Sequence, residues 1–341
     1  MQIEVQLDAA PAAARERAEW LVACGVDGLF TFEGAHDVFL PLGQAASTGV
    51  DLMTNVAIAL PRSPLHLAHA AYDLQLLSGG RFSLGLGSQI RPHIENRYGA
   101  TWSRPAARMR ESVLAVKAIL HAWQHGTRLA FEGEFTRHTL MAAAFDPGPN
   151  PHGVPPILMG ALGPVMTRTA AEVADGLLVM PFNSARHFEE RTLPAVREGL
   201  ARAAREEGDF QVIPQIIAGV GTTEAELGPA RDGVRRLLAF YGSTPAYLPV
   251  LDAEGRADLQ PELNRLSKVG GVDGMAALVD DEMVAAMAVV GTPEECAAKI
   301  VERFGHVAQK VCVYFPGQQI TADNLSRLAK ALHALPGGSL G

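Results

Sequence analysis

Short apolar runs alternate with longer amphipathic stretches along most of the chain. Short runs rich in branched and aromatic residues are typical of strands that are buried on both faces. Between them, apolar residues recur every three or four positions, as a helix with one buried face requires. This periodicity predicts helices at residues 11–24, 63–77 and 105–123. The apolar runs predict strands at residues 3–7, 28–32, 53–60, 81–87, 156–159, 176–180, 212–220 and 310–315.

The regular alternation of strands and helices indicates an α/β fold with parallel strands. Eight strands separated by helices predict a (β/α)8 TIM barrel, with an open doubly wound sheet as the alternative. The barrel is favoured because candidate polar residues follow the carboxyl ends of several strands. We expect residues 1–341 to form one barrel domain with rim insertions at about 124–155 and 242–290. The first insertion contains a predicted hairpin at 128–140.

The composition narrows the class of protein. Hydrophobic residues make up 48% of the 341 residues and charged residues 19%, which is enough to bury a large core. The net charge of −8 gives no basis for nucleic-acid binding, and no apolar run is long enough to span a membrane. Three widely spaced cysteines indicate neither a disulfide framework nor a cysteine metal site, and they fit a reducing cytoplasm. The histidines form no metal-binding pattern, so no metal is predicted.

One candidate site lies where the strand at 156–159 meets the next helix. Gly160, Ala161, Leu162 and Gly163 are followed by Pro164, a residue that suits the first helical position. Free backbone N–H groups at a helix start bind phosphate when glycine allows a close approach. An ordinary strand-to-helix turn with the same proline is the alternative.

Three further segments end or contain predicted strands. His36 follows the second strand, where a barrel places catalytic groups, although it also suits a loop histidine bonded to the backbone. Asn55 begins an otherwise apolar strand. Gly85 and Gly87 interrupt the fourth strand, and Ser88 and Gln89 end it. Glycine inside a strand indicates either a bulge or the close approach of another group.

Taken together, these segments resemble the bacterial luciferase-like monooxygenase superfamily. The resemblance rests on "TNVAIALPRSP", "LSGGRFSLGLG", "WSRPAARMRE", "PILMGALGPVMTRTAAEVADG" and "VVGTPEECAAKI", which match in order and spacing. The segments "HDVFLPL" and "SQIRPHIENRYG" are most similar to the actinobacterial branch that uses the deazaflavin coenzyme F420. The resemblance covers nearly the whole chain.

The resemblance implies a coenzyme F420-dependent oxidoreductase that transfers hydride between the deazaflavin C5 atom and a small organic substrate. An FMN-dependent monooxygenase of the same fold and a non-catalytic cofactor-binding barrel are the alternatives. His36 would act as the catalytic residue, and a homodimer would be common in the family. A cis peptide bond is implied at Asn55–Val56 or Val56–Ala57. The implied cofactor-binding residues are Asn55, Val56, Ala57, Gly85, Gly87, Ser88, Gln89, Gly160, Ala161, Leu162, Gly163 and Pro164.

The sequence departs from the family pattern at one position of interest. Some deazaflavin dehydrogenases have an acidic residue soon after the glycines of the fourth strand, where this chain has Gln89, Ile90 and Arg91. A second acid–base carboxylate is therefore not assigned, and Glu33 and Glu95 are the possible replacements.

Overall fold

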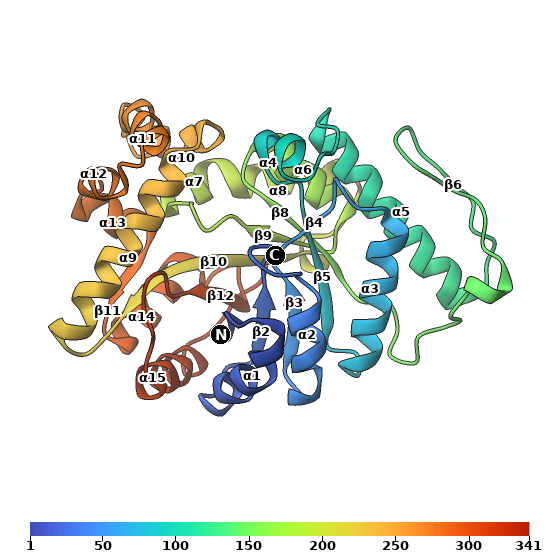
Figure 1. The fold of residues 1–341 in the computed structure, drawn as a ribbon, viewed down its shortest axis with the longest axis horizontal. Helices are drawn as coiled ribbons and strands as arrows, with labels where there is room; N and C mark the ends of the chain where they lie inside the picture. Colours follow the sequence, from blue (N-terminus) through green and yellow to red (C-terminus); the bar gives the residue numbers. More distant parts are fainter. Residues whose placement is uncertain (341) are drawn as a thin grey trace.

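The computed structural model describes residues 1–340 and shows parallel strands closed into a barrel (Figure 1). Each barrel strand pairs with its two neighbours in the order β1–β2–β3–β5–β8–β9–β10–β12, and β12 pairs back with β1. The closed ring confirms the TIM barrel and excludes the open sheet. The barrel strands are β1 (Gln2–Gln6), β2 (Gly28–Thr31), β3 (Asp51–Thr54), β5 (Phe82–Gly87), β8 (Ile157–Ala161), β9 (Gly176–Val179), β10 (Gln211–Val220) and β12 (Lys310–Tyr314).

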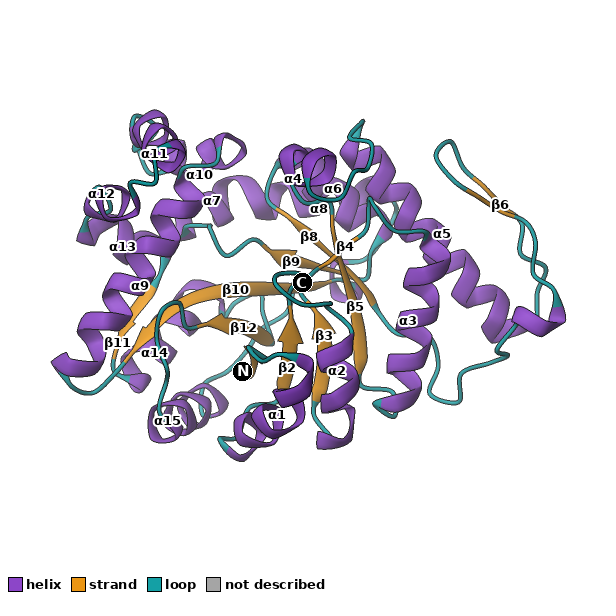
Figure 2. Ribbon diagram, in the orientation of Figure 1, coloured by secondary structure: helices purple, strands orange, loops and turns teal. Residues whose placement is uncertain are grey.

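Helices surround the strands (Figure 2). The apolar face predicted for the segment 105–123 is confirmed, because Met109, Val113 and Val116 are fully buried on α5. The capping boxes at Thr223 and Thr292 start α9 and α14. The helices are α1 (Ala14–Ala23), α2 (Leu40–Ala45), α3 (Pro64–Leu77), α4 (Arg91–Asn96), α5 (Pro105–His125), α6 (Pro164–Val173), α7 (Ala185–His187), α8 (Leu193–Arg202), α9 (Glu224–Gly242), α10 (Leu248–Ala253), α11 (Leu259–Lys268), α12 (Val272–Ala277), α13 (Asp281–Met287), α14 (Pro293–Phe304) and α15 (Ala322–His333).

The inside of the barrel is filled by side chains. Residues that point inward from six strands form their own buried cluster, which consists of Phe30, Met53, Leu158, Leu178, Ile213 and Cys312. Below this layer, the buried Glu4 carboxylate lies 2.8 Å from the Lys310 ammonium group, which also bonds Asp51 at 3.0 Å. A buried carboxylate needs such a partner, since an unpaired charge in the interior is strongly unfavourable. The packed interior confines any ligand to the open ends of the barrel.

Two segments extend beyond the barrel. The predicted hairpin is confirmed as β6 (Phe131–Glu132) paired antiparallel with β7 (Arg137–His138), and it stands away from the barrel beyond α5 (Figure 1). Helices α10–α13 pack on α9 with a separate apolar cluster, and the chain then returns through β11 (Val289–Gly291). The assignment of these segments as rim insertions in a single domain stays a prediction. Within residues 1–340, no helix is both long and apolar enough to cross a membrane.

Candidate functional site

The third barrel strand contains a bulge at its carboxyl end. Residues 53–60 were expected to form one strand, but the structure has β3 (Asp51–Thr54) and a separate β4 (Ala57–Ile58). Met53 pairs with Ser83 and Ala57 pairs with Leu86, so four steps along this strand match three steps along β5. The extra residue bends the chain, as bulges near functional sites commonly do. The peptide bond between Asn55 and Val56 is cis, which is one of the two positions expected.

The two glycines of β5 make room for this bulge. A Cβ atom on Gly85 would lie 1.9 Å from the backbone oxygen of Thr54, and one on Gly87 would lie 2.4 Å from Val56 Cγ2. The Thr54 hydroxyl replaces the missing backbone pairing, since it accepts from Gly85 N–H at 2.9 Å and donates to Gly85 C=O at 2.8 Å. The groups nearest to these glycines are therefore protein atoms, and the glycines shape the site through the bulge.

Val56 lies at the centre of the predicted residues. A Cβ atom on Gly160 of β8 would lie 3.1 Å from Val56 Cγ1, so the half-buried valine side chain contacts both β5 and β8. The structure thus brings together the predicted residues Val56 of the bulge, Gly87 of β5 and Gly160 of β8. Ser88 and Gln89 follow directly at the end of β5, and Gln89 adopts a left-handed φ of 60°.

Asn55 has a buried side chain without a partner. The residue is 4% exposed, and its amide nitrogen and oxygen make no hydrogen bond to a described residue, although the amide faces the buried Cys312 thiol. Buried polar groups are normally satisfied, so an unpaired amide indicates a missing partner such as a water molecule or a ligand. The Asn55 backbone lies just beyond β3, at the carboxyl end of the barrel strands, and its amide faces the interior layer that contains Cys312.

The predicted phosphate cradle has an open backbone. Gly163 is extended (φ −71°, ψ 151°), and a Cβ atom there would have no neighbour within 4 Å. Pro164 starts α6, as predicted, and no side chain caps this helix end. The first-turn N–H groups of Val165 and Met166 have no acceptor within the helix. An uncapped helix start with an accessible glycine has the features of an anion site.

The loop after β2 carries His36 and the neighbouring Asp37. His36 is exposed and has no hydrogen-bond partner among residues 1–340. The neighbouring Asp37 carboxylate accepts from the backbone N–H groups of Phe39 and Leu40 at 2.8 and 3.0 Å, which fixes the loop. The structure therefore places His36 on the expected loop but does not bring it into contact with the bulge.

The opposite side of the barrel mouth contains residues that the sequence did not identify. The Tyr314 hydroxyl at the end of β12 donates to Gln215 Oε1 on β10 at 2.6 Å. Burial raises the pKa of Tyr314 well above its usual value, so its hydroxyl stays protonated. The Tyr241 ring on α9 lies 6.0 Å from the Phe182 ring, which follows β9. Alternation along β10 and β12 could have placed Gln215 and Tyr314 on the inner face.

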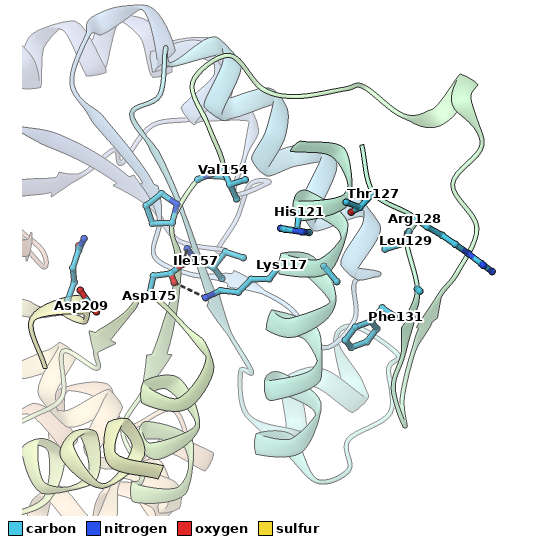
Figure 3. A pocket seen from close by; sticks show the side chains of 15 residues that line it. Lys117, His121, Thr127, Arg128, Leu129, Phe131, Val154, Ile157, Asp175 and Asp209 are labelled. Atoms are coloured by element: carbon cyan, nitrogen blue, oxygen red, sulfur yellow. Dashed lines mark hydrogen bonds and ion pairs between the residues drawn. The ribbon is translucent and has the colours of Figure 1, made fainter. Parts of the chain in front are cut away.

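A cavity at the other end of the barrel lies apart from these residues. Its volume is about 820 Å³, and it borders the starts of β8, β9 and β10 beside α5 (Figure 3). The Lys117 ammonium group on α5 bonds the Asp175 carboxylate across it at 2.7 Å. Catalytic groups of barrels occupy the carboxyl ends of the strands, so this cavity is not assigned to the candidate site. Among residues 1–340, no three His, Cys, Asp or Glu residues form a group that could hold a metal ion.

Comparison with known proteins identifies related chains. The family model described as luciferase-like monooxygenase matches residues 2–309. An uncharacterised protein of Mycobacterium tuberculosis is 46% identical over 306 residues, which cover 89% of this chain and 90% of that protein. The 5,10-methylenetetrahydromethanopterin reductase of Archaeoglobus fulgidus is 30% identical over 249 residues, which cover 70% of this chain and 69% of that protein. The solved structure of a coenzyme F420 dependent tetrahydromethanopterin reductase from Methanopyrus kandleri has the same fold, with a TM-score of 0.80, 21% identity and 98% coverage of both chains.

Proposed function

The chain belongs to the luciferase-like monooxygenase family, and on this premise we propose that it is a coenzyme F420-dependent oxidoreductase acting on a small organic substrate. The choice of F420 is supported by the fold that the chain shares with the coenzyme F420 dependent reductase of Methanopyrus kandleri and by its 30% identity to the Archaeoglobus fulgidus reductase. The observation on this chain that carries the proposal is the unpaired, buried Asn55 amide at the barrel mouth.

The bulge would hold the ring of the cofactor. A deazaflavin ring is flat, with a polar edge that carries both donors and acceptors, and the Asn55 amide offers one of each. The Val56 side chain beside it provides an apolar surface on which a ring can rest. These residues fit the group, because a polar edge would satisfy the amide and a flat face would cover the valine.

The start of α6 would hold the phosphate of the cofactor. The N–H groups of Val165 and Met166 point along the helix axis toward its N-terminal end, where the helix dipole also favours a negative charge. Gly163 leaves the approach open, since nothing lies within 4 Å of where its side chain would be. The two parts of the site lie on β3–β4 and after β8, on either side of β5.

His36 would donate or accept the proton that accompanies hydride transfer. The deazaflavin supplies two-electron hydride chemistry at C5, and reduction of a carbonyl by hydride also consumes one proton at oxygen, which the reverse reaction releases. An imidazole changes charge near neutral pH and can therefore give or take this proton. The Asp37 hydrogen bonds to Phe39 and Leu40 would keep the His36 loop at the mouth. A homodimer and a cytoplasmic location belong to the same proposal and rest on the family resemblance and the cysteine pattern.

The Gly163→Val variant tests the proposed function at the phosphate cradle. We expect the purified wild-type protein to bind oxidised F420 and the variant to bind it at least about tenfold more weakly, a loss of about 1.4 kcal/mol. The branched side chain would block the anion, whereas the extended backbone at this position accepts valine without strain. Equilibrium titration followed by fluorescence gives both affinities.

Gly208→Val is the matched control, because Gly208 also has no neighbour within 4 Å but lies before β10, at the opposite end of the barrel. Equal affinities of the Gly163→Val variant and the wild type would show that this segment is an ordinary strand-to-helix turn and not a phosphate site. No F420 binding by the wild type would contradict the proposed function itself.

A further inference from the structure

One carboxylate at the barrel mouth is almost completely enclosed by hydrogen-bond donors. Glu33 lies two residues beyond the end of β2, and its side chain is only 7% exposed. The sequence left Glu33 and Glu95 as possible replacements for a second acid–base carboxylate, and nothing in their spacing selected one of them. A carboxylate buried to this extent needs strong partners to remain charged.

Three donors from two segments, residues 58–62 and the chain after α4, converge on this carboxylate. Glu33 Oε2 accepts from the backbone N–H of Ile58 at 2.8 Å and from Arg62 Nη1 at 2.5 Å. Glu33 Oε1 accepts from the Tyr98 hydroxyl at 2.7 Å. Arg62 Nη1 also donates to the Ile58 carbonyl at 2.9 Å, so the guanidinium and the carboxylate enclose both polar groups of the Ile58 backbone.

These bonds fix the position of the bulge. Ile58 is the last residue of β4, which begins directly after the bulge and pairs with Leu86 and Gly87 of β5. The two-residue strand has few backbone bonds of its own, so the Glu33 carboxylate and Arg62 contribute much of what fixes its position. Hydrogen bonds to charged groups are stronger than those between neutral groups.

The same network of hydrogen bonds also fixes the position of the His36 loop. Arg97 Nη2 donates to the Gly34 carbonyl at 2.7 Å, and its neighbour Tyr98 donates to Glu33. The segment after α4 is thus attached twice to the loop that carries His36. Glu33 therefore joins the two parts of the candidate site that make no direct contact, the bulge and the histidine loop.

The bonds also argue against an acid–base role for Glu33. Each carboxylate oxygen already accepts from a donor, and one of them also forms an ion pair with Arg62. Burial, with the bond to Glu33 as the next cause, raises the pKa of Tyr98 to about 12, so this hydroxyl remains a donor at physiological pH. The other candidate, Glu95, forms an exposed ion pair with Arg91 at 2.9 Å on α4.

We propose that Glu33 is a positioning residue, which acts through Ile58, Arg62 and Tyr98 to hold the Asn55–Val56 bulge and the His36 loop in their working arrangement. This inference rests on the proposed function, since the arrangement it preserves is the deazaflavin site.

The Glu33→Gln variant tests it, because glutamine keeps the size but replaces one accepting oxygen with a donor. Amide hydrogen exchange at residues 56–59 should become at least tenfold faster than in the wild type. Oxidised F420 should bind at least tenfold more weakly at every pH from about 6 to 9, with an unchanged pH dependence, because a residue that only positions other groups exchanges no proton with the ligand. Tyr98→Phe removes one of the three bonds and should produce a smaller change in the same direction.

Glu95→Gln is the matched control and should resemble the wild type in both measurements. A Glu33→Gln variant with wild-type exchange and affinity would overturn the proposal, as would a loss of the pH dependence, which would make Glu33 a titrating group of the site. If Glu33→Gln does not fold, Tyr98→Phe takes its place: faster amide exchange at residues 56–59 and weaker F420 binding support the proposal, and wild-type values of both overturn it. If the wild type does not bind F420, the proposed function fails separately, and the exchange rates at residues 56–59 alone support or overturn the positioning role.

Discussion

His36→Ala is expected to slow hydride transfer about 10²–10⁴-fold, the usual contribution of one general acid or base. The exposed imidazole lies on the loop after β2, at the end of the barrel where the unpaired Asn55 amide also lies. Affinity for F420 should fall much less than the rate, because the ring and the phosphate would be held by other elements.

Single-turnover measurement is the appropriate experiment for this variant, since it separates the chemical step from product release. His121→Ala is a suitable control, because His121 is an equally exposed histidine on α5 at the opposite end of the barrel. If His36→Ala transfers hydride at the wild-type rate but binds F420 more weakly, His36 positions the ring. The proton must then pass through another group or through water.

Gly85→Ala is expected to destabilise the fold by about 3 kcal/mol or more, at the upper end of the usual cost of overpacking. The added methyl group would lie 1.9 Å from the Thr54 carbonyl oxygen and 2.7 Å from Leu178 Cδ1. The leucine can move slightly, but the backbone oxygen is fixed because the Thr54 hydroxyl bonds both polar groups of Gly85. The bulge would therefore have to shift, and F420 binding should be lost with it.

Chemical denaturation gives the change in the free energy of unfolding. Gly43→Ala is the control, because Gly43 lies within α2 and a Cβ atom there meets nothing within 4 Å. Alanine in a helix is favoured over glycine, so the control should be neutral or slightly stabilising. A Gly85→Ala protein as stable as the wild type would show that the bulge can move freely, which contradicts its role as a fixed support.

The barrel could be predicted because its strands are buried on both faces and its helices on one. These conditions leave continuous apolar runs and a period of three to four residues, which local sequence reports directly. Residue patterns alone could not place the break in the third strand, because a polar Asn55 in the largely apolar run 53–60 does not mark a break; only the family resemblance indicated a cis peptide bond there. The bulge depends on the glycines of a neighbouring strand, and its position becomes evident only when β5 is paired with β3 and β4.

The candidate site was predicted where it coincides with a local motif, as at Gly163 and Pro164. The Glu33 network was missed because its partners lie 25, 29 and 65 residues away along the chain. Glu33 was considered only as an acid because a single sequence shows a carboxylate but not the donors around it.

Competitive titration of the purified protein with oxidised F420 and FMN tests the central claim most directly. The account predicts micromolar or tighter binding of F420 and at least about tenfold weaker binding of FMN, a difference of about 1.4 kcal/mol. Tighter binding of FMN would contradict it and favour a flavin-dependent monooxygenase. Binding of neither cofactor would contradict both enzyme hypotheses and leave the non-catalytic barrel.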